Sequence, residues 1–201
     1  EQVDKKDEEF LNLWVKIPNL ISKTSPDGKS DKDNLEIKKV GNVKEISNPK
    51  DHLEIASKLN LIDVEKAAEV SGSRFAYLFG DLVKIEFSLV SWALNKLSEK
   101  GFTPTVPPVL VRENALYGTG FFPDDAEQVY EIPNDELYLV GTSEVPLAAL
   151  HANEIINMEQ LPIRYAGFST CFRREAGTYG KDTTGIFRVH QFDKVEMFSF
   201  C

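Results

Sequence analysis

Residues 187–200, FRVHQFDKVEMFSF, determine the fold prediction for this 201-residue chain, because their aromatic and β-branched residues predict one long β-strand. Successive side chains of a strand point to opposite faces of a sheet. One face would then carry Arg188, His190, Phe192, Lys194 and Glu196. The pattern therefore predicts a strand that displays charged and aromatic side chains together.

A second strand is predicted over residues 163–175, in which Arg173 and Glu175 share a face. A loop over 176–186 with three glycines, Gly180 among them, would join the two strands. If the strands pair, their common surface offers arginines, an aromatic ring and carboxylates. An aromatic ring can stack on a nucleobase, arginines bind phosphate oxygens, and carboxylates accept hydrogen bonds.

The same pattern also suits the solvent-facing side of an ordinary sheet, where mixed charges are common. Arg173 and Glu175 could form a surface ion pair, worth about 0–1 kcal/mol, and Phe192 could pack in a core. The chain has no glycine-rich phosphate loop and no dinucleotide fingerprint. Patterning alone leaves both interpretations open, and a nucleotide site here would have to use arginine side chains.

Upstream, the clearest helix is predicted over 82–100, where apolar residues recur with the helical period and Gly101 marks the end. Asp51 and Asp63 are predicted as N-caps of two shorter helices. The shorter helices are predicted at 1–14, 51–59, 63–72 and 145–156, and the shorter strands at 35–40, 102–111 and 137–140. The prolines of 102–111 place that strand at an edge. Together these elements predict an α+β fold with an antiparallel sheet flanked by helices.

Composition excludes several classes of protein. The net charge of −9 argues against non-specific binding to nucleic acid, and no apolar run reaches the roughly 18 residues of a membrane span. Cys171 and Cys201 are predicted as free thiols, and the scattered histidines predict no zinc site. The chain starts without Met and without a signal peptide, so we expect it to begin inside a longer gene product.

Several motifs resemble those of one known family. Residues 171–177, CFRREAG, followed by 185–196, GIFRVHQFDKVE, resemble motif 2 of the seryl-tRNA synthetases, which are class II aminoacyl-tRNA synthetases. Residues 141–144, GTSE, resemble the Thr-x-Glu serine loop of that family, and the helix and strand that end at Pro107 and Pro108 resemble motif 1, its dimerisation element. Further matches occur in order at 17–19, 51–52, 71–75 and 117–120. The resemblance spans roughly residues 10–201.

The resemblance implies an ATP site. Its predicted residues are Arg173, Arg174, Glu175, Arg188, Val189 and Phe192. Arg173 would bridge the serine carboxylate and the α-phosphate, and Arg188 would hold the γ-phosphate; these two are the predicted catalytic residues. Glu175 would accept from the adenine amino group, and Phe192 would stack on the adenine. Val189 would contribute its backbone, whereas patterning alone leaves Arg174 as an exposed neighbour.

The resemblance also implies a serine site. Its predicted residues are Thr142, Ser143, Glu144, Arg173 and Glu196. Thr142 and Glu144 would bind the ammonium group of serine, and Glu196 would take its hydroxyl. Thr142 or Ser143 could instead cap the helix that follows, an interpretation that fits Ser143 in particular.

The implied activity is that of a serine–tRNA ligase, with ATP and Mg²⁺, L-serine, tRNA(Ser) and a second copy of the chain as its partners, in the cytoplasm, a mitochondrion or a plastid and not in a membrane. Residues 1–16 would be the remnant of an N-terminal tRNA-binding arm, and 17–201 a partial catalytic domain that is incomplete at its C-terminus. Motif 3 and the Mg²⁺ ligands are expected beyond residue 201, since the chain ends within a predicted strand. The alternatives are a non-catalytic synthetase-like dimerisation or binding module and an amino-acid:carrier-protein ligase.

Overall fold

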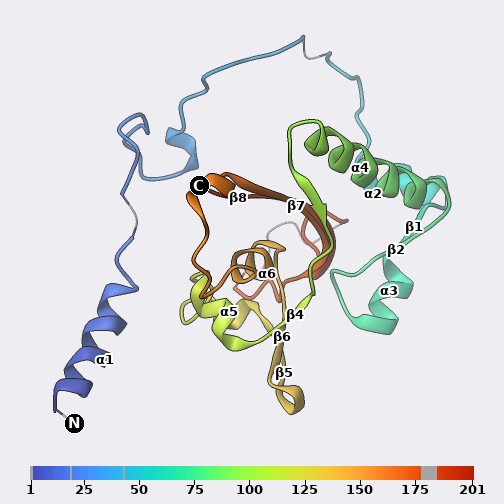
Figure 1. The fold of residues 1–201 in the computed structure, drawn as a ribbon. Helices are drawn as coiled ribbons and strands as arrows, with labels where there is room; N and C mark the ends of the chain where they lie inside the picture. The colour runs from blue at the N-terminus through green and yellow to red at the C-terminus, as the bar shows by residue number, and fades with distance from the viewer. Residues whose placement is uncertain (1, 19, 43, 178–184) are drawn as a thin grey trace. The chain divides into compact units, whose positions relative to one another are not determined.

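The computed structural model describes residues 2–18, 20–42, 44–177 and 185–201, which are shown in Figure 1. The chain divides into two compact units, Glu1–Pro49 and Lys50–Cys201. Most of the predicted glycine loop, including Gly180, lies outside the described residues. No helix within the described ranges is long and apolar enough to cross a membrane.

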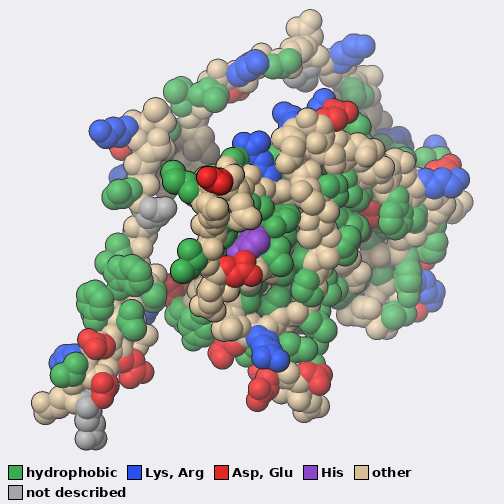
Figure 2. Space-filling model, in the orientation of Figure 1, with side chains coloured by type: hydrophobic (Ala, Val, Ile, Leu, Met, Phe, Trp, Pro, Cys, Tyr) green, Lys and Arg blue, Asp and Glu red, His purple; other side chains and the backbone are tan. Residues whose placement is uncertain are grey.

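The first unit contains a helix, α1 (Gln2–Trp14), and a short 3-10 helix, η1 (Asp31–Asp33). All of its described residues are exposed, Phe10 and Trp14 of α1 among them. Figure 2 shows hydrophobic side chains next to acidic ones near this end of the chain. The predicted helix over 1–14 is confirmed. The predicted strand over 35–40 is wrong, because these residues have no strand to pair with in the described part of this unit.

The second unit begins with two short helices and a two-stranded sheet. These elements are α2 (His52–Lys58), β1 (Ile62–Asp63), α3 (Val64–Ser71) and β2 (Tyr77–Leu78). The Asp51 carboxylate accepts a hydrogen bond from the backbone N–H of Glu54 at 2.7 Å, and that of Asp63 accepts one from Lys66 at 2.8 Å. Each bond satisfies an N–H that the first turn of a helix leaves without a partner. Both predicted N-caps are therefore confirmed.

A three-stranded sheet forms the centre of the second unit. Its strands are β3 (Thr103–Thr105), β7 (Ile163–Phe172) and β8 (Gln191–Phe200), in the order β3-β7-β8. β7 and β8 pair antiparallel over ten residues each, whereas β3 runs parallel to β7. The α+β class is confirmed, but this sheet is mixed rather than wholly antiparallel. The strand β3, which contains Pro104, lies at the edge of the sheet, in keeping with its missing N–H donor.

Two helices cover the β7–β8 hairpin. They are α4 (Asp81–Ser98) and α6 (Glu144–Ala149), and both contact β7 and β8. They lie on different sides of the strands in Figure 1. The helix predicted over 145–156 ends earlier, at Ala149, because turns follow and Asn153 takes a positive φ of 63°.

A second three-stranded sheet joins this layer to the rest of the unit. Its strands are β4 (Leu110–Val111), β6 (Leu137–Leu139) and β5 (Tyr130–Ile132), in the order β4-β6-β5, and both pairings are antiparallel. The connecting helices are α5 (Glu113–Gly118), η2 (Ala126–Gln128), η3 (Pro133–Asp135) and η4 (Met158–Gln160). The main hydrophobic cluster lies here and consists of Val111, Leu116, Val129, Val140 and Val145. The backbone N–H of Phe172 donates to the Val140 carbonyl at 2.9 Å, which links the two sheets.

Gly167 allows α6 to approach β7 closely. A Cβ at this position would lie 2.7 Å from Cδ1 of Leu147 and 3.1 Å from Cβ of Ser143, both buried residues. Such distances are shorter than normal van der Waals contact, so a side chain here would force the Leu147 side chain or α6 itself to shift. The distance of the 142–144 segment from β8 therefore depends on this glycine.

Replacing Gly167 with Ala is expected to lower the free energy of unfolding by about 1–3 kcal/mol, the usual cost of overpacking. Urea denaturation of the protein measures this change. Gly118→Ala is the matched control, because a Cβ there meets no atom within 4 Å, and it should leave stability unchanged or slightly raised. A loss of stability as large in Gly118→Ala as in Gly167→Ala would contradict the packing argument.

On the face of the hairpin that packs against α4, the titration of Glu86 makes the stability of the fold depend on pH. Burial raises the pKa of Glu86 in α4, and the nearby charge of Asp193 in β8 raises it further. The folded state therefore binds this proton more strongly than the unfolded chain does. Stability from this group is complete below the unfolded pKa of about 4.3 and is lost as the pH rises through the higher folded value.

Glu86→Gln is consequently expected to stabilise the protein near neutral pH, by no more than about 1 kcal/mol because water screens a partly exposed carboxylate. The difference between variant and wild type should shrink towards zero at about pH 4, below the unfolded pKa. Urea midpoints at the two pH values measure it. The same difference at both pH values would show that Glu86 does not titrate as described.

Candidate active site

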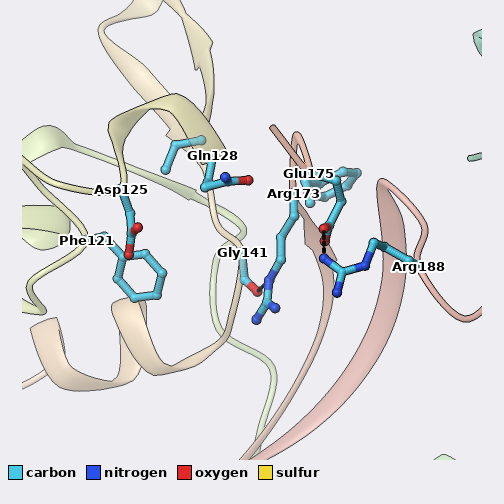
Figure 3. A pocket seen from close by; sticks show the side chains of 9 residues that line it. Phe121, Asp125, Gln128, Gly141, Arg173, Glu175 and Arg188 are labelled. Carbon is cyan, nitrogen blue, oxygen red and sulfur yellow. Dashed lines mark hydrogen bonds and ion pairs between the residues drawn. The ribbon is translucent and has the colours of Figure 1, made fainter. Parts of the chain in front are cut away.

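A cavity of about 320 Å³ opens beside the end of the β7–β8 hairpin (Figure 3). Its lining residues are Phe121, Asp125, Gln128, Val129, Gly141, Phe172, Arg173, Glu175 and Arg188. One wall comes from the segment between α5 and β5. The other comes from Gly141, from the end of β7 with the residues that follow it, and from Arg188 before β8. Three of the predicted ATP-site residues, Arg173, Glu175 and Arg188, thus line one cavity.

The Arg173 guanidinium is held between a carbonyl group and an aromatic ring. Its Nε donates to the Gly141 carbonyl oxygen at 3.1 Å, and its Cζ lies 5.2 Å from the centre of the Phe192 ring. In Figure 3 the Arg173 side chain lies beside Gly141. Arginine can stack on an aromatic face and still present donors in a planar fork. Arg173 and Phe192, both predicted site residues, are therefore in contact.

Glu175 and Arg188 form an ion pair across the opening of the hairpin. Nη1 of Arg188 lies 2.7 Å from Oε2 of Glu175, and the Glu175 side chain is only 12% exposed (Figure 3). Gln128 fixes the adjacent backbone, because its side chain accepts from the N–H of Ala176 at 3.1 Å and donates to the Ala176 carbonyl at 3.0 Å. Gln128 was absent from the sequence prediction, and no pattern in its own segment indicates this contact.

The predicted strand face is wrong at this end of the hairpin. β7 ends at Phe172 and β8 begins at Gln191, so Arg173, Glu175 and Arg188 lie outside the strands. Glu175 has a positive φ of 51°, which breaks the alternation that a strand would give. The three side chains meet because the backbone turns, and not because they share a strand face.

Three predicted ATP-site residues, Arg174, Val189 and Phe192, lie outside the cavity lining. Arg174 is exposed, and its backbone N–H donates to the Gln128 carbonyl at 2.9 Å. Val189 is partly buried between Arg188 and His190. Their contacts with a nucleotide stay predictions.

A second cluster of polar side chains lies on the face of β8 that also carries Phe192. The Thr142 hydroxyl donates to Oε2 of Glu196 at 2.9 Å, and Thr142 itself is 2% exposed. Lys194 contacts both the Thr142 hydroxyl and the Glu196 carboxylate. Thr142 and Glu196 were predicted together, whereas Lys194 was assigned no role. Its place two residues before Glu196 on one strand face was the signal that could have identified it.

The other residues of the predicted serine loop behave differently. Ser143 is fully buried, and its hydroxyl bonds with that of Ser169 at 2.8 Å, so the interpretation of its side chain as a helix cap is wrong. The Thr142 hydroxyl instead accepts from the N–H of Glu144 at 3.2 Å. The Glu144 side chain is exposed. Beneath the loop, burial raises the pKa of the Cys171 thiol, which is free as predicted.

The two clusters share a chemistry of charge recognition. Two guanidinium groups can bind phosphate oxygens, an aromatic ring can stack on a base, and the hydroxyl–ammonium–carboxylate cluster can bind a small zwitterion. Within the described ranges, no group of three or more His, Cys, Asp or Glu side chains could hold a metal ion.

Comparison with known proteins identifies this arrangement. A family model for the class II tRNA synthetase core domain (G, H, P, S and T) matches residues 128–201, which include both clusters. The serine–tRNA ligase 1 of Streptomyces avermitilis is 52% identical over 198 residues, covering 96% of this chain and 46% of that protein. The serine–tRNA ligase of Mycobacterium marinum is also 52% identical, over 192 residues, with the same coverage.

Solved structures agree with the sequence comparison. Seryl-tRNA synthetase from Pyrococcus horikoshii, complexed with ATP, matches 98% of this chain with a TM-score of 0.92 and 39% identity. The cytoplasmic serine–tRNA ligase of Naegleria fowleri, in complex with AMP, matches the same share with a TM-score of 0.90 and 33% identity. The chain spans about half the length of these relatives, 46% of the two bacterial ligases and 49% and 48% of the two solved chains.

Proposed function

Because this chain belongs to the seryl-tRNA synthetase family, we propose that the protein activates L-serine with ATP to give seryl-adenylate and transfers the seryl group to tRNA(Ser). The observation that carries the proposal is the pair of neighbouring clusters. The cavity collects Arg173, Glu175 and Arg188, and the adjacent face of β8 collects Thr142 and Glu196. The cavity suits ATP and the Thr142–Glu196 cluster suits serine, the two substrates of the activation step.

ATP would occupy the cavity. The similar structures from P. horikoshii and N. fowleri bind ATP and AMP, which supports an adenine-nucleotide site. Arg173 would bind the α-phosphate and Arg188 the γ-phosphate, while Phe192 would stack on the adenine and Glu175 would accept from its amino group. Glu175 and Arg188 are already within hydrogen-bond distance of each other, so the two side chains would present an acceptor and a donor from one rigid pair.

Serine would bind at the Thr142 cluster. Thr142 and Glu144 would bind its ammonium group, Arg173 its carboxylate, and Glu196 its hydroxyl. Lys194 contacts both Thr142 and Glu196, so we add it as the residue that holds these two side chains in place. Alanine lacks the hydroxyl that would donate to Glu196, and sites built on such a hydrogen bond discriminate by roughly 10⁴-fold or more.

The reaction needs alignment more than covalent catalysis. A serine carboxylate oxygen attacks the α-phosphorus, the bond from that phosphorus to the bridging oxygen breaks, and pyrophosphate leaves. Arg173, between the two substrates, would neutralise the charge that develops on the α-phosphate and hold the attacking oxygen in line. Mg²⁺, when bound, would neutralise phosphate charge, and we propose that its ligands lie beyond residue 201.

The remaining parts of the chain complete the proposal. Residues 1–16, which include α1, would be the end of a tRNA-binding arm, and residues 17–201 part of the catalytic domain. The division by compactness falls later, between Pro49 and Lys50. We also propose that the protein is located in the cytoplasm and is not attached to a membrane.

We further propose that α4 mediates a homodimer. Ile85, Leu89 and Trp92 lie four and three residues apart on one side of this helix and are 52%, 60% and 64% exposed. Val106, just beyond β3, is 81% exposed. Side chains with this helical spacing form one continuous stripe. An exposed apolar stripe of this kind is typical of an interaction surface, and motif 1 of this family is its dimerisation element.

The full-length protein is expected to catalyse serine-dependent ATP–pyrophosphate exchange, and Arg173→Ala to lower the rate by at least about 100-fold, the loss seen when a donor to a developing charge is removed. Arg164→Ala is the matched control, since Arg164 lies at the far end of β7 beside Phe102. Exchange at the wild-type rate by Arg173→Ala would refute the assignment of this residue.

The double variant Leu89→Glu/Trp92→Glu is expected to convert the dimer to a monomer, because burying two carboxylates in an apolar interface is strongly unfavourable. Sedimentation velocity of the full-length protein measures the change. Ser91→Glu adds a charge to the same helix off the stripe and should remain dimeric. A dimer that persists in the double variant would place the interface elsewhere.

A further inference from the structure

We infer that His52, at the start of α2, is a positioning residue that holds the segment carrying Arg188 in place for ATP. The inference rests on the proposed function, because it concerns the same nucleotide site. His52 lies outside the cavity lining, and it reaches the site through residues 185–187. Its contact with that segment joins positions that are 134 residues apart in the sequence.

The first contact is a hydrogen bond to the backbone. Nε2 of His52 accepts from the N–H of Ile186 at 3.0 Å. A histidine nitrogen accepts only when it carries no proton, so the geometry assigns the proton of the neutral ring to Nδ1. A side chain without an acceptor at this point would leave the Ile186 N–H without this partner.

The second contact is steric. A Cβ on Gly185 would lie 2.1 Å from Nε2 and 2.4 Å from Cε1 of His52, so the ring lies directly against the Gly185 backbone. Gly185 also has a φ of +77°, a conformation that glycine adopts without strain. The ring can approach this closely only because position 185 has no side chain.

The third contact is between two rings. The centres of the His52 and Phe187 rings are 4.4 Å apart, with an interplanar angle of 71°, an edge-to-face arrangement. Phe187 is 80% exposed even with this contact. Three consecutive residues, 185 to 187, therefore rest on one imidazole ring.

These contacts matter because the next residue is Arg188. Its guanidinium lies at the cavity, paired with Glu175 (Figure 3). A surface segment of glycine and exposed side chains has little packing to order it, so a fixed anchor one or two residues before Arg188 restricts where that side chain can reach. His52 is itself held at the first turn of α2, whose N-cap is Asp51.

The test compares His52→Leu, which removes the acceptor, with His52→Gln, whose side-chain oxygen can reach the position of Nε2. In the full-length protein, His52→Leu is expected to raise the KM for ATP by about five- to tenfold, the effect of losing roughly one hydrogen bond and one ring contact. The KM for serine should stay within about twofold, because Thr142 and Glu196 do not depend on this segment. His52→Gln should restore most of the affinity for ATP.

His151→Leu is the matched control. This histidine is also partly buried and bonds through Nε2 to the Tyr165 hydroxyl at 2.9 Å, but it lies after α6, where its ring packs against Tyr165 and Phe200. Its replacement should leave the KM for ATP unchanged. Hydrogen exchange at the Ile186 amide gives a readout without catalysis, and it should become faster in His52→Leu and stay slow in His52→Gln and His151→Leu.

Three results would overturn the inference. These are an unchanged KM for ATP in His52→Leu, an equal rise in the KM for both substrates, or unchanged exchange at Ile186. A failure of the proposed function is distinguishable, because the wild-type protein would then show no serine-dependent exchange of pyrophosphate. The calorimetric Kd for ATP alone would in that case replace the KM for the same variants, and a wild-type protein that binds no ATP would refute both proposals.

Discussion

The register of β7 against β8 is the constraint on which the site depends. The pairing places Gly167 opposite Glu196, and continues with Ser169 opposite Lys194. Members of such pairs point to the same face, so the residues under α6 and the polar cluster of β8 share one side of the sheet. A slip of one residue would move Glu196 and Lys194 to the side covered by α4. The hydrogen bond between Thr142 and Glu196 would then be impossible.

The second sheet contributes the other half of the site at a fixed distance. Its strand β6 leads into Gly141 and Thr142. The hydrogen bond from the Phe172 N–H to the Val140 carbonyl ties the end of β6 to the end of β7. Arg173 follows at once and bonds back to Gly141. Because both links lie within a few residues of the cavity, the arginine and the threonine loop are positioned by backbone packing rather than by long side chains.

Features that depend on local sequence could be predicted, and features that depend on distant contacts could not. The N-caps Asp51 and Asp63 and the long hairpin follow from residue type and period. The parallel partner of β3 and the contact of Gln128 with Ala176 involve segments whose approach no local pattern encodes. Alternation failed just beyond Phe172, since one positive φ at Glu175 ends the period of two. The predicted site residues came from a family resemblance, and the geometry then brought several of them together and added Lys194.

The contact of His52 with Gly185 has a consequence for how this protein can change over evolutionary time. The two positions are not free to vary separately, since a side chain at 185 collides with the ring at 52. A lineage that gains any larger residue at 185 must first lose the imidazole, and it must also tolerate a positive φ. Position 185 is therefore restricted to glycine as long as histidine occupies position 52, and we expect the two positions to covary.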